Sequence, residues 1–251
     1  MSSASSSGLK HRESLVLKTD FGSRPRILAT ALLIFGLSQL LAGALISGLA
    51  GLGGWSTQSA ALQFCYIFLA ETLAVFGVLK ILKVRGLTRK SIGLVRPKLG
   101  DIPRALLAFV AFYAVLLVIL SIAILLVPEL DTHQKQLVGF EPTVLGIDRL
   151  LAFVGLVILP PLAEEILIRG YLYSGLRRSL AFAPAALFTS LLFGLAHLEL
   201  GAAAAPLWIA AINTFVLSLV LVYLREKAGS LWPPIMVHSL NNLVAFISFI
   251  S

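Results

Sequence analysis

Six polar residues lie inside apolar stretches of the chain and could together carry out acid–base chemistry. They are Glu164, Glu165, Arg169, His197, His238 and Asn242. An ionisable side chain at the centre of a bilayer segment costs about 2.5 to 3.5 kcal/mol, so such groups usually face a cavity or pair with one another at a working site. Because all six residues lie in the last four apolar stretches, the sequence predicts one buried site.

The two adjacent acids are expected to have different roles. Glu165 and Arg169 are four residues apart, with the acid nearer the helix N-terminus, which is the favourable order for an ion pair. Such a pair neutralises Arg169, whose role is then structural rather than catalytic. Glu164 points about 100 degrees away from its neighbour and has no cation, so it is available as a general base. Pro160 and Pro161 interrupt the helix just upstream and predict a wet pocket beside Glu164.

A predicted hairpin places an acid and a histidine at one depth. A turn at residues 178–182 joins two spans in antiparallel order. Glu164 and His197 are equally distant from this turn in sequence, so at about 1.5 Å rise per residue their side chains reach the same height. We therefore expect the two side chains to contact each other. The alternative is that they are unrelated, Glu164 as a capped carboxylate and His197 as a core histidine.

The last apolar stretch carries a second pair of polar side chains. His238 and Asn242 lie at i and i+4 and project to the same side, whereas Asn241 faces elsewhere. An imidazole and a carboxamide are donors suited to a developing oxyanion. The alternative is hydrogen bonding between helices. Asn213 could belong to the same polar network.

The composition predicts a membrane protein. Apolar residues make up 58% of the chain and charged residues only 13%, unlike soluble domains of this length. Apolar runs of about 18 residues or more have the length that a bilayer requires. The predicted spans are 27–49, 60–79, 105–127, 150–177, 181–198, 206–224 and 231–251. We therefore expect an all-α fold, a polytopic bundle of about seven transmembrane helices, in the plasma membrane if the source is bacterial.

The basic residues alternate between successive loops. Of 20 Lys and Arg residues, 17 lie in four regions, and only Lys135 and Arg149 lie in the loops between them. The four regions are 1–26, 80–104, 177–178 and 225–227. The positive-inside rule assigns these regions and the N-terminus to the cytoplasm. The net charge of +8 thus indicates membrane topology and contact with anionic lipid, and we expect no nucleic-acid partner.

Three short motifs occur in a fixed order. Residues 164–169 read EExxxR, residues 193–197 read FxxxH, and residues 238–242 read HxxxN. Together these motifs resemble the CPBP intramembrane proteases, also called the Abi or CAAX-protease and bacteriocin-processing family. The resemblance covers residues 145–251, and no motif residue is missing.

The resemblance implies a membrane endopeptidase that hydrolyses a peptide bond. In this family the first glutamate of EExxxR activates water with the histidine of FxxxH, and the histidine and asparagine of HxxxN hold the oxyanion or help to build the site. The catalytic residues implied here are Glu164, Glu165, His197, His238 and Asn242, supported by Arg169 and Phe193.

The expected organisation of the chain follows from the spans and the motifs. Residues 1–26 are a polar tail that we expect to be disordered. Residues 27–144 hold the first three helices with the basic cytoplasmic loop 80–104. Residues 145–251 form the catalytic core of four helices.

The resemblance leaves the need for a metal open, since the family has been described both with and without one. Glu164, His197 and His238 could supply three ligands to zinc and leave a position for water. No HExxH motif is present. A general base must be free of metal, and because Glu165 is committed to Arg169, we favour the version without metal and expect no other cofactor.

The expected partners are the bilayer and a peptide or protein substrate. Eukaryotic relatives act on prenylated chains and bacterial relatives on other peptides, and nothing in the chain chooses between them or indicates an oligomeric state. One alternative is a non-catalytic immunity or assembly factor that retains the family fold. Another is a proton-coupled carrier that uses Glu71, Glu164 and the two histidines as a relay. The lack of an internal repeat disfavours the carrier. Glu71 alone could equally be a hydrogen-bonded structural carboxyl.

Overall fold

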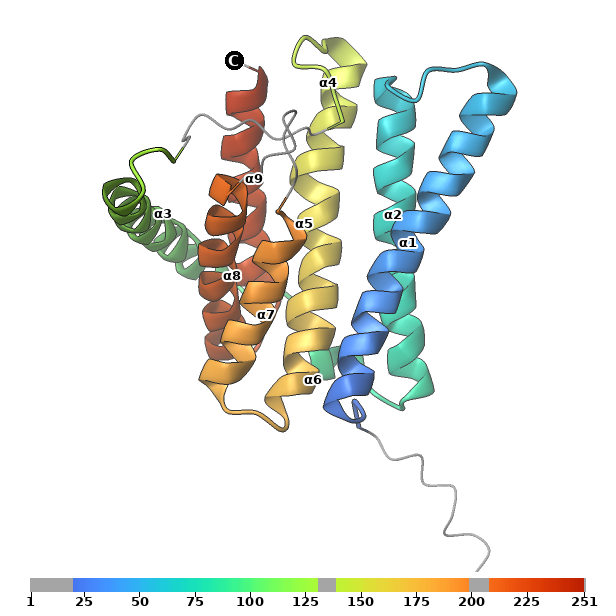
Figure 1. Cartoon of the computed structure of the whole chain (residues 1–251). Coiled ribbons are helices and arrows are strands. Elements are labelled where there is room, and N and C mark those ends of the chain that lie inside the picture. The colour runs from blue at the N-terminus through green and yellow to red at the C-terminus, as the bar shows by residue number, and fades with distance from the viewer. Residues whose placement is uncertain (1–19, 131–138, 199–207, 251) are drawn as a thin grey trace, which may run out of the picture.

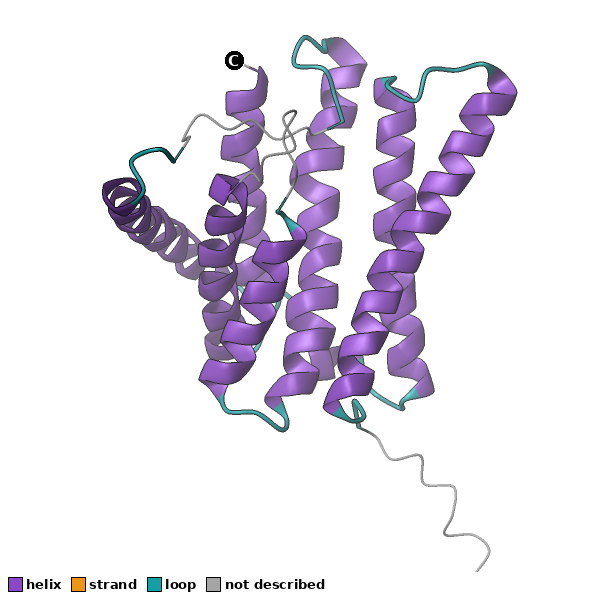
Figure 2. Cartoon of the chain, viewed as in Figure 1, coloured by secondary structure: helices purple, strands orange, loops and turns teal. Residues whose placement is uncertain are grey.

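The computed structural model describes residues 20–130, 139–198 and 208–250, and these residues form helices and the loops between them. Figure 1 shows the path of the chain, and Figure 2 shows no strand in the parts that are described. Six of the helical segments are long and apolar enough to cross a membrane. The predicted all-α polytopic membrane bundle is therefore confirmed.

Each predicted span corresponds to a helix or to a run of consecutive helices. The elements are α1 Arg24–Gly53, α2 Ala60–Val84, the 3₁₀ helix η2 Arg89–Ile92, α3 Asp101–Leu126, α4 Gly146–Phe153, the π-helix η3 Val154–Ile158, α5 Leu159–Glu164, the π-helix η4 Glu165–Tyr173, α6 Ser174–Arg177, α7 Phe182–Ala196, α8 Trp208–Ala228 and α9 Trp232–Ile250. The five elements from α4 to α6 follow one another without a break and form the fourth span, Gly146–Arg177.

The fourth span is the centre of the bundle. It packs against α1 and α2 on one side and against α7, α8 and α9 on the other, and Figure 1 shows this arrangement. It is the most buried of the membrane-crossing segments. The span that carries EExxxR is therefore surrounded by the helices that carry the other two motifs.

Helix α3 lies at the outside of the bundle, against α8 and α9. Figure 1 shows it steeply inclined to the other helices. Leu107, Leu117 and Leu125 are exposed on its surface. Lipid tails are as apolar as leucine side chains, so apolar residues of a membrane-spanning helix can contact lipid directly. This exposure needs no protein partner.

Helix α7 is shorter than the other spans. It has 15 residues, which at about 1.5 Å per residue extend over roughly 22 Å, less than the roughly 30 Å of a bilayer's hydrocarbon core. It begins at Phe182, directly after the turn that the sequence predicted. Since it cannot cross the whole core, its end at Ala196 and the capping residue His197 lie at membrane depth.

The predicted tail and two predicted loops lie partly or wholly outside the described residues. Residues 1–19 of the tail, Lys135 and the whole of loop 199–205 are in this group. The described end of the tail is packed, because Phe21 is buried in the core of the bundle. Helix α1 begins at Arg24, whose guanidinium donates hydrogen bonds to the side chain and carbonyl of Ser179 at 2.9 and 2.7 Å.

Candidate active site

Glu165 is held by two cationic or potentially cationic side chains. Its Oε1 accepts a hydrogen bond from Nη1 of Arg169 at 2.7 Å and lies 3.0 Å from Nδ1 of His238. The side chains of Glu165 and Arg169 are both 0% exposed. The ion pair predicted from the i, i+4 spacing is confirmed, and the same carboxylate also orients His238.

The ring of Phe193 joins the rest of the motif residues. The guanidinium of Arg169 lies 4.4 Å from its centroid, a cation–π contact that favours a desolvated cation. The ring of His197 lies 4.6 Å away on another side, and that of His238 lies 5.8 Å away, edge to face. The phenylalanine of FxxxH is therefore the packing centre between the two histidines and the arginine.

The tautomer of His197 follows from its backbone contact. Its Nδ1 lies 2.8 Å from the carbonyl oxygen of Phe193. A carbonyl oxygen only accepts hydrogen bonds, so Nδ1 carries the proton. In the neutral ring Nε2 is then a hydrogen-bond acceptor, and this nitrogen is free to receive a proton.

Glu164 is the acid of the motif that is left free. Its Oε2 is buried without a hydrogen-bond partner among the described residues. It lies 3.8 Å from Nε2 of His238, and the side chain is 23% exposed. The side chain of Glu164 is therefore partly accessible although its Oε2 is buried, whereas the side chain of Glu165 is fully buried.

The structure does not make the contact expected between Glu164 and His197. Both residues are described, and neither a hydrogen bond nor an ion pair joins them. Equal sequence distance from the turn gives equal depth only where both arms are uniform α-helices. The fourth span instead contains two π-helices, which have wider turns, and the His197 ring turns back to its own helix. The Phe193 ring contacts the rings of both His197 and His238. It therefore links His197 to Glu164, Glu165 and His238, which we call the acidic cluster.

Asn242 is bonded to a backbone carbonyl of the fourth span. Its Nδ2 donates to the carbonyl oxygen of Leu156 at 2.9 Å. In a helix that oxygen would accept from the amide four or five residues later, but residues 160 and 161 are prolines and have no N–H. The side chain therefore supplies the missing donor. This is the hydrogen bond between helices that the sequence left open as the alternative for Asn242.

The two other asparagines lie apart from the acidic cluster. Oδ1 of Asn241 accepts from the hydroxyl of Tyr113 on α3 at 3.4 Å, so Asn241 faces away from its motif neighbours, as predicted. Oδ1 of Asn213 is buried without a partner in the described part of the chain, and no hydrogen bond joins it to the motif residues there.

Glu71 brings a third carboxyl group to the site from outside the motifs. Helix α2 packs against α5, which ends at Glu164. The carboxyl groups of Glu71 and Glu164 are close enough to interact electrostatically, and Glu71 is half-buried. The sequence signalled this residue as an intramembrane acid, but its spacing gave no information about its neighbours.

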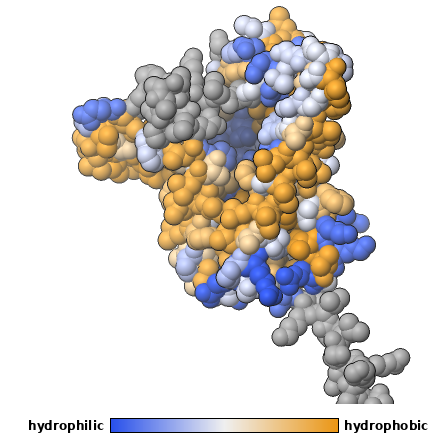
Figure 3. Space-filling view, turned by 45° about the vertical axis from the view of Figure 1, so that its right-hand side comes forward, coloured by the Kyte–Doolittle hydropathy of each residue, from blue (hydrophilic) through white to orange (hydrophobic). Residues whose placement is uncertain are grey.

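The surface of the bundle is hollowed and hydrophilic in one place. Figure 3 shows hydrophilic residues at the base of a hollow, with apolar residues on the surface below it. A second hollow is almost wholly apolar, with a volume of about 450 Å³ between α3, the fourth span and α9. Leu106, Val157 and Leu240 are among its lining residues, and Ser239 also lines it, directly after His238.

The described residues do not fit a zinc site. Among residues 20–130, 139–198 and 208–250, no three His, Cys, Asp or Glu side chains are grouped so that they could hold a metal ion. Glu164 and His238 are close to each other, but His197 is not bonded to either. In His238, Nε2 faces Glu164 and Nδ1 is already hydrogen-bonded to Glu165.

The comparisons with known proteins agree with the motifs. Residues 146–244 match the family model described as type II CAAX prenyl endopeptidase Rce1-like, and all three motifs lie within this match. It covers about two fifths of the chain. Neither the curated proteins nor the solved structures contain a match.

Proposed function

From the match of residues 146–244 to the type II CAAX prenyl endopeptidase model and from the three motifs, we propose that the chain is a member of the CPBP family. We propose that it hydrolyses a peptide bond at membrane depth, with Glu164 as the general base. The observation that carries the proposal is the unequal state of the two adjacent acids. Glu165 is fully buried and bonded to Arg169 and His238. Each of the two acids has one buried oxygen without a partner, but within the described residues Glu164 accepts no hydrogen bond from a side chain, and it is 23% exposed.

In the proposed reaction a water molecule attacks the scissile carbonyl while Glu164 takes its proton. General-base catalysis of this kind contributes about 10² to 10⁴ in rate. Nε2 of His197 is a second proton acceptor beside the cluster, positioned by the bond from Nδ1 to Phe193. The carbon–nitrogen bond then breaks, and the proton held by Glu164 passes to the leaving amine.

His238 is the proposed donor to the tetrahedral oxyanion. Its Nδ1 donates to Glu165, so a neutral ring has no proton on Nε2. In the imidazolium form Nε2–H also becomes a donor beside Glu164.

Asn242 is proposed to stabilise the shape of the site and not the oxyanion directly. Its amide bonds to Leu156, and this contact joins α9 to the interrupted part of the fourth span. His238 is one turn away on the same helix, so the contact fixes the height of its imidazole relative to Glu164 and Glu165.

The apolar hollow beside α9 supports a lipidated peptide as substrate. At about 450 Å³ with an almost wholly apolar lining, it is comparable to sites that enclose small apolar ligands. Ser239, the residue after His238 on α9, lines it, so we propose that an apolar chain bound there places an attached peptide on the side of α9 close to the motif residues. The hollow also faces α3, which lies against lipid.

The proposed function predicts cleavage that does not depend on metal. The full-length protein is reconstituted into vesicles and given a peptide library in prenylated and unprenylated forms. We expect cleavage of prenylated members with turnover unchanged by stringent chelation, because the described residues do not form a metal-binding group. Cleavage and bound zinc are measured in the same samples. Turnover that chelation abolishes and zinc restores would contradict the proposed base.

A second prediction concerns His197. We expect His197→Ala to lower kcat at least about a hundredfold, the lower end of the range for a lost proton acceptor. His197→Gln is the matched control, since its amide can still donate to the Phe193 carbonyl but cannot accept a proton. Both variants should keep the wild-type melting temperature. Wild-type turnover in His197→Gln would assign the histidine to packing alone.

A further inference from the structure

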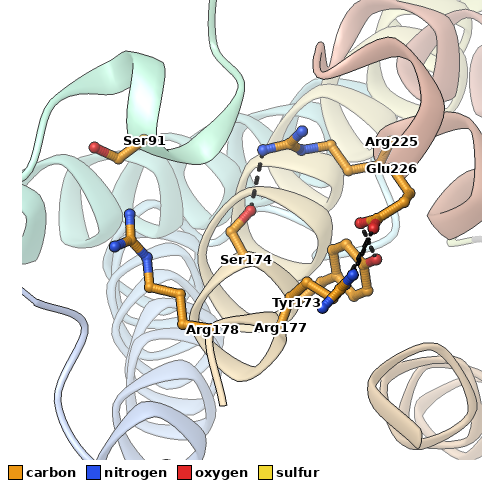
Figure 4. A pocket seen from close by; sticks show the side chains of 7 residues that line it. All are labelled: Ser91, Tyr173, Ser174, Arg177, Arg178, Arg225 and Glu226. Atoms are coloured by element: carbon orange, nitrogen blue, oxygen red, sulfur yellow. Dashed lines mark hydrogen bonds and ion pairs between the residues drawn. The ribbon is translucent and has the colours of Figure 1, made fainter. Parts of the chain in front are cut away.

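A polar cavity lies at the end of the bundle where the basic segments meet, away from the acidic cluster. Its volume is about 210 Å³, and it is lined by Ser91, Ser174, Arg177, Arg178, Arg225 and Glu226, with Tyr173 beside them. Figure 4 shows that the side chains come from three separate parts of the chain: η2, the end of the fourth span and the end of α8. The positive-inside rule assigns this end to the cytoplasm.

One of the three arginines is already neutralised. Arg177 donates from Nε and Nη2 to Oε1 of Glu226 at 3.1 and 3.0 Å. The hydroxyl of Tyr173 donates to the other oxygen of the same carboxylate at 2.6 Å. Within the described residues no ion pair joins Arg178 or Arg225 to an acid. The cavity therefore retains an excess of positive charge.

Arg225 is fixed in place with an unused donor. Its Nη2 donates to the hydroxyl of Ser174 at 3.1 Å, while its Nε is buried without a partner in the described chain. The guanidinium lies against Gly93, where a Cβ atom would come within 2.5 Å of its Cζ, and Gly93 has φ +77°. A side chain at this position would displace the arginine. A buried donor without a partner is destabilising, and an anion in the cavity would supply an acceptor.

The geometry points to an anion site for a phosphate group in this cavity. Figure 4 shows the guanidinium groups of Arg178 and Arg225 and the side chain of Ser174 around one space. Guanidinium groups bind phosphate oxygens through paired N–H donors. The hydroxyl of Ser174 already donates to the carbonyl oxygen of Arg169, and that of Ser91 is bonded to Thr88, so the two guanidinium groups are the donors of the site. The phosphate belongs either to the head group of an anionic lipid in the cytoplasmic leaflet or to a soluble phosphate compound.

The cavity suits a phosphate group in size and charge. A water molecule occupies about 30 Å³ in the liquid, so about 210 Å³ holds a phosphate with a few waters. Two arginines without acidic partners match a phosphate monoester, which carries about −1.5 to −2 at neutral pH. Basic pockets between helices on the cytoplasmic side are a known way of binding anionic head groups.

The test measures binding to the purified full-length protein in an uncharged detergent. The probes are dioctanoyl phosphatidic acid, dioctanoylglycerol, which has the same chains without phosphate, and inorganic phosphate. We expect phosphatidic acid to bind at least tenfold more tightly than dioctanoylglycerol. Phosphatidic acid that binds more tightly than inorganic phosphate identifies a lipid head group, and equal affinities identify a soluble phosphate. Wild-type protein that binds neither phosphate probe, or that binds phosphatidic acid no better than dioctanoylglycerol, would overturn the site.

Variants separate the cavity from general surface charge. Arg225→Gln and Arg178→Gln should each weaken binding of the phosphate probes about tenfold or more, as expected for a lost charge-assisted hydrogen bond. Arg178 is exposed, so its variant should fold normally even if Arg225→Gln does not. Lys83→Gln removes one exposed charge outside the cavity and should leave binding unchanged. Equal affinities in Arg178→Gln, Lys83→Gln and the wild type would overturn the proposal.

Discussion

We expect Glu164→Gln to lower kcat for peptide cleavage by about three orders of magnitude, within the range for loss of a general base. Glutamine has nearly the shape of glutamate but cannot take a proton from water at neutral pH. The oxygen it replaces has no hydrogen-bond partner among the described residues, so the change should leave the fold intact. KM should change little, because the lost interaction belongs to the transition state.

The control for this variant is Glu141→Gln, the same change at an exposed loop position. It should keep wild-type turnover, and all three proteins should share one melting temperature. A Glu164→Gln protein that cleaves at the wild-type rate would remove the base from the proposed reaction. The same vesicles also test the carrier alternative, which requires uptake driven by a pH gradient in the absence of peptide.

The sequence predicted the features that depend on local spacing. The Glu165–Arg169 pair follows from four residues of helical separation, and the turn before Phe182 follows from the break between two apolar runs. The direction of Asn241, away from His238 and Asn242, follows from its place on α9. In each case the interacting groups are close in sequence or related by the helical repeat, so no knowledge of the packing was needed.

The contacts between helices could not be predicted in this way. Pro160 and Pro161 showed that backbone acceptors lose their donors, but not that Asn242 supplies one to Leu156. The bond between His238 and Glu165 depends on how α9 and the fourth span are rotated. The proximity of Glu71 to Glu164 depends on the packing of α2, a helix outside the motifs. The expected contact between Glu164 and His197 is absent, and the sequence did not indicate the two π-helices that alter the turns of the fourth span.

The stability of the site depends most on the buried ion pair, and Arg169→Met should therefore cost about 3 to 5 kcal/mol. The variant leaves the Glu165 carboxylate buried with His238 as its only bonded partner. It also removes the cation from the face of Phe193. Thermal unfolding of the purified protein in detergent measures the loss. The comparison is Arg177→Met, which breaks a pair whose side chains are 38% and 30% exposed, and exposed pairs contribute far less.

The double variant Arg169→Met with Glu165→Leu separates stability from catalysis. Replacing a buried ion pair by apolar side chains of similar size is often neutral or stabilising, so we expect most of the lost stability to return. Activity should not return, because Glu165 is also the group that orients Nδ1 of His238. A double variant that regained both stability and turnover would show that this carboxylate does not position the histidine. One that regained neither would mean that the apolar pair does not pack in place of the ion pair.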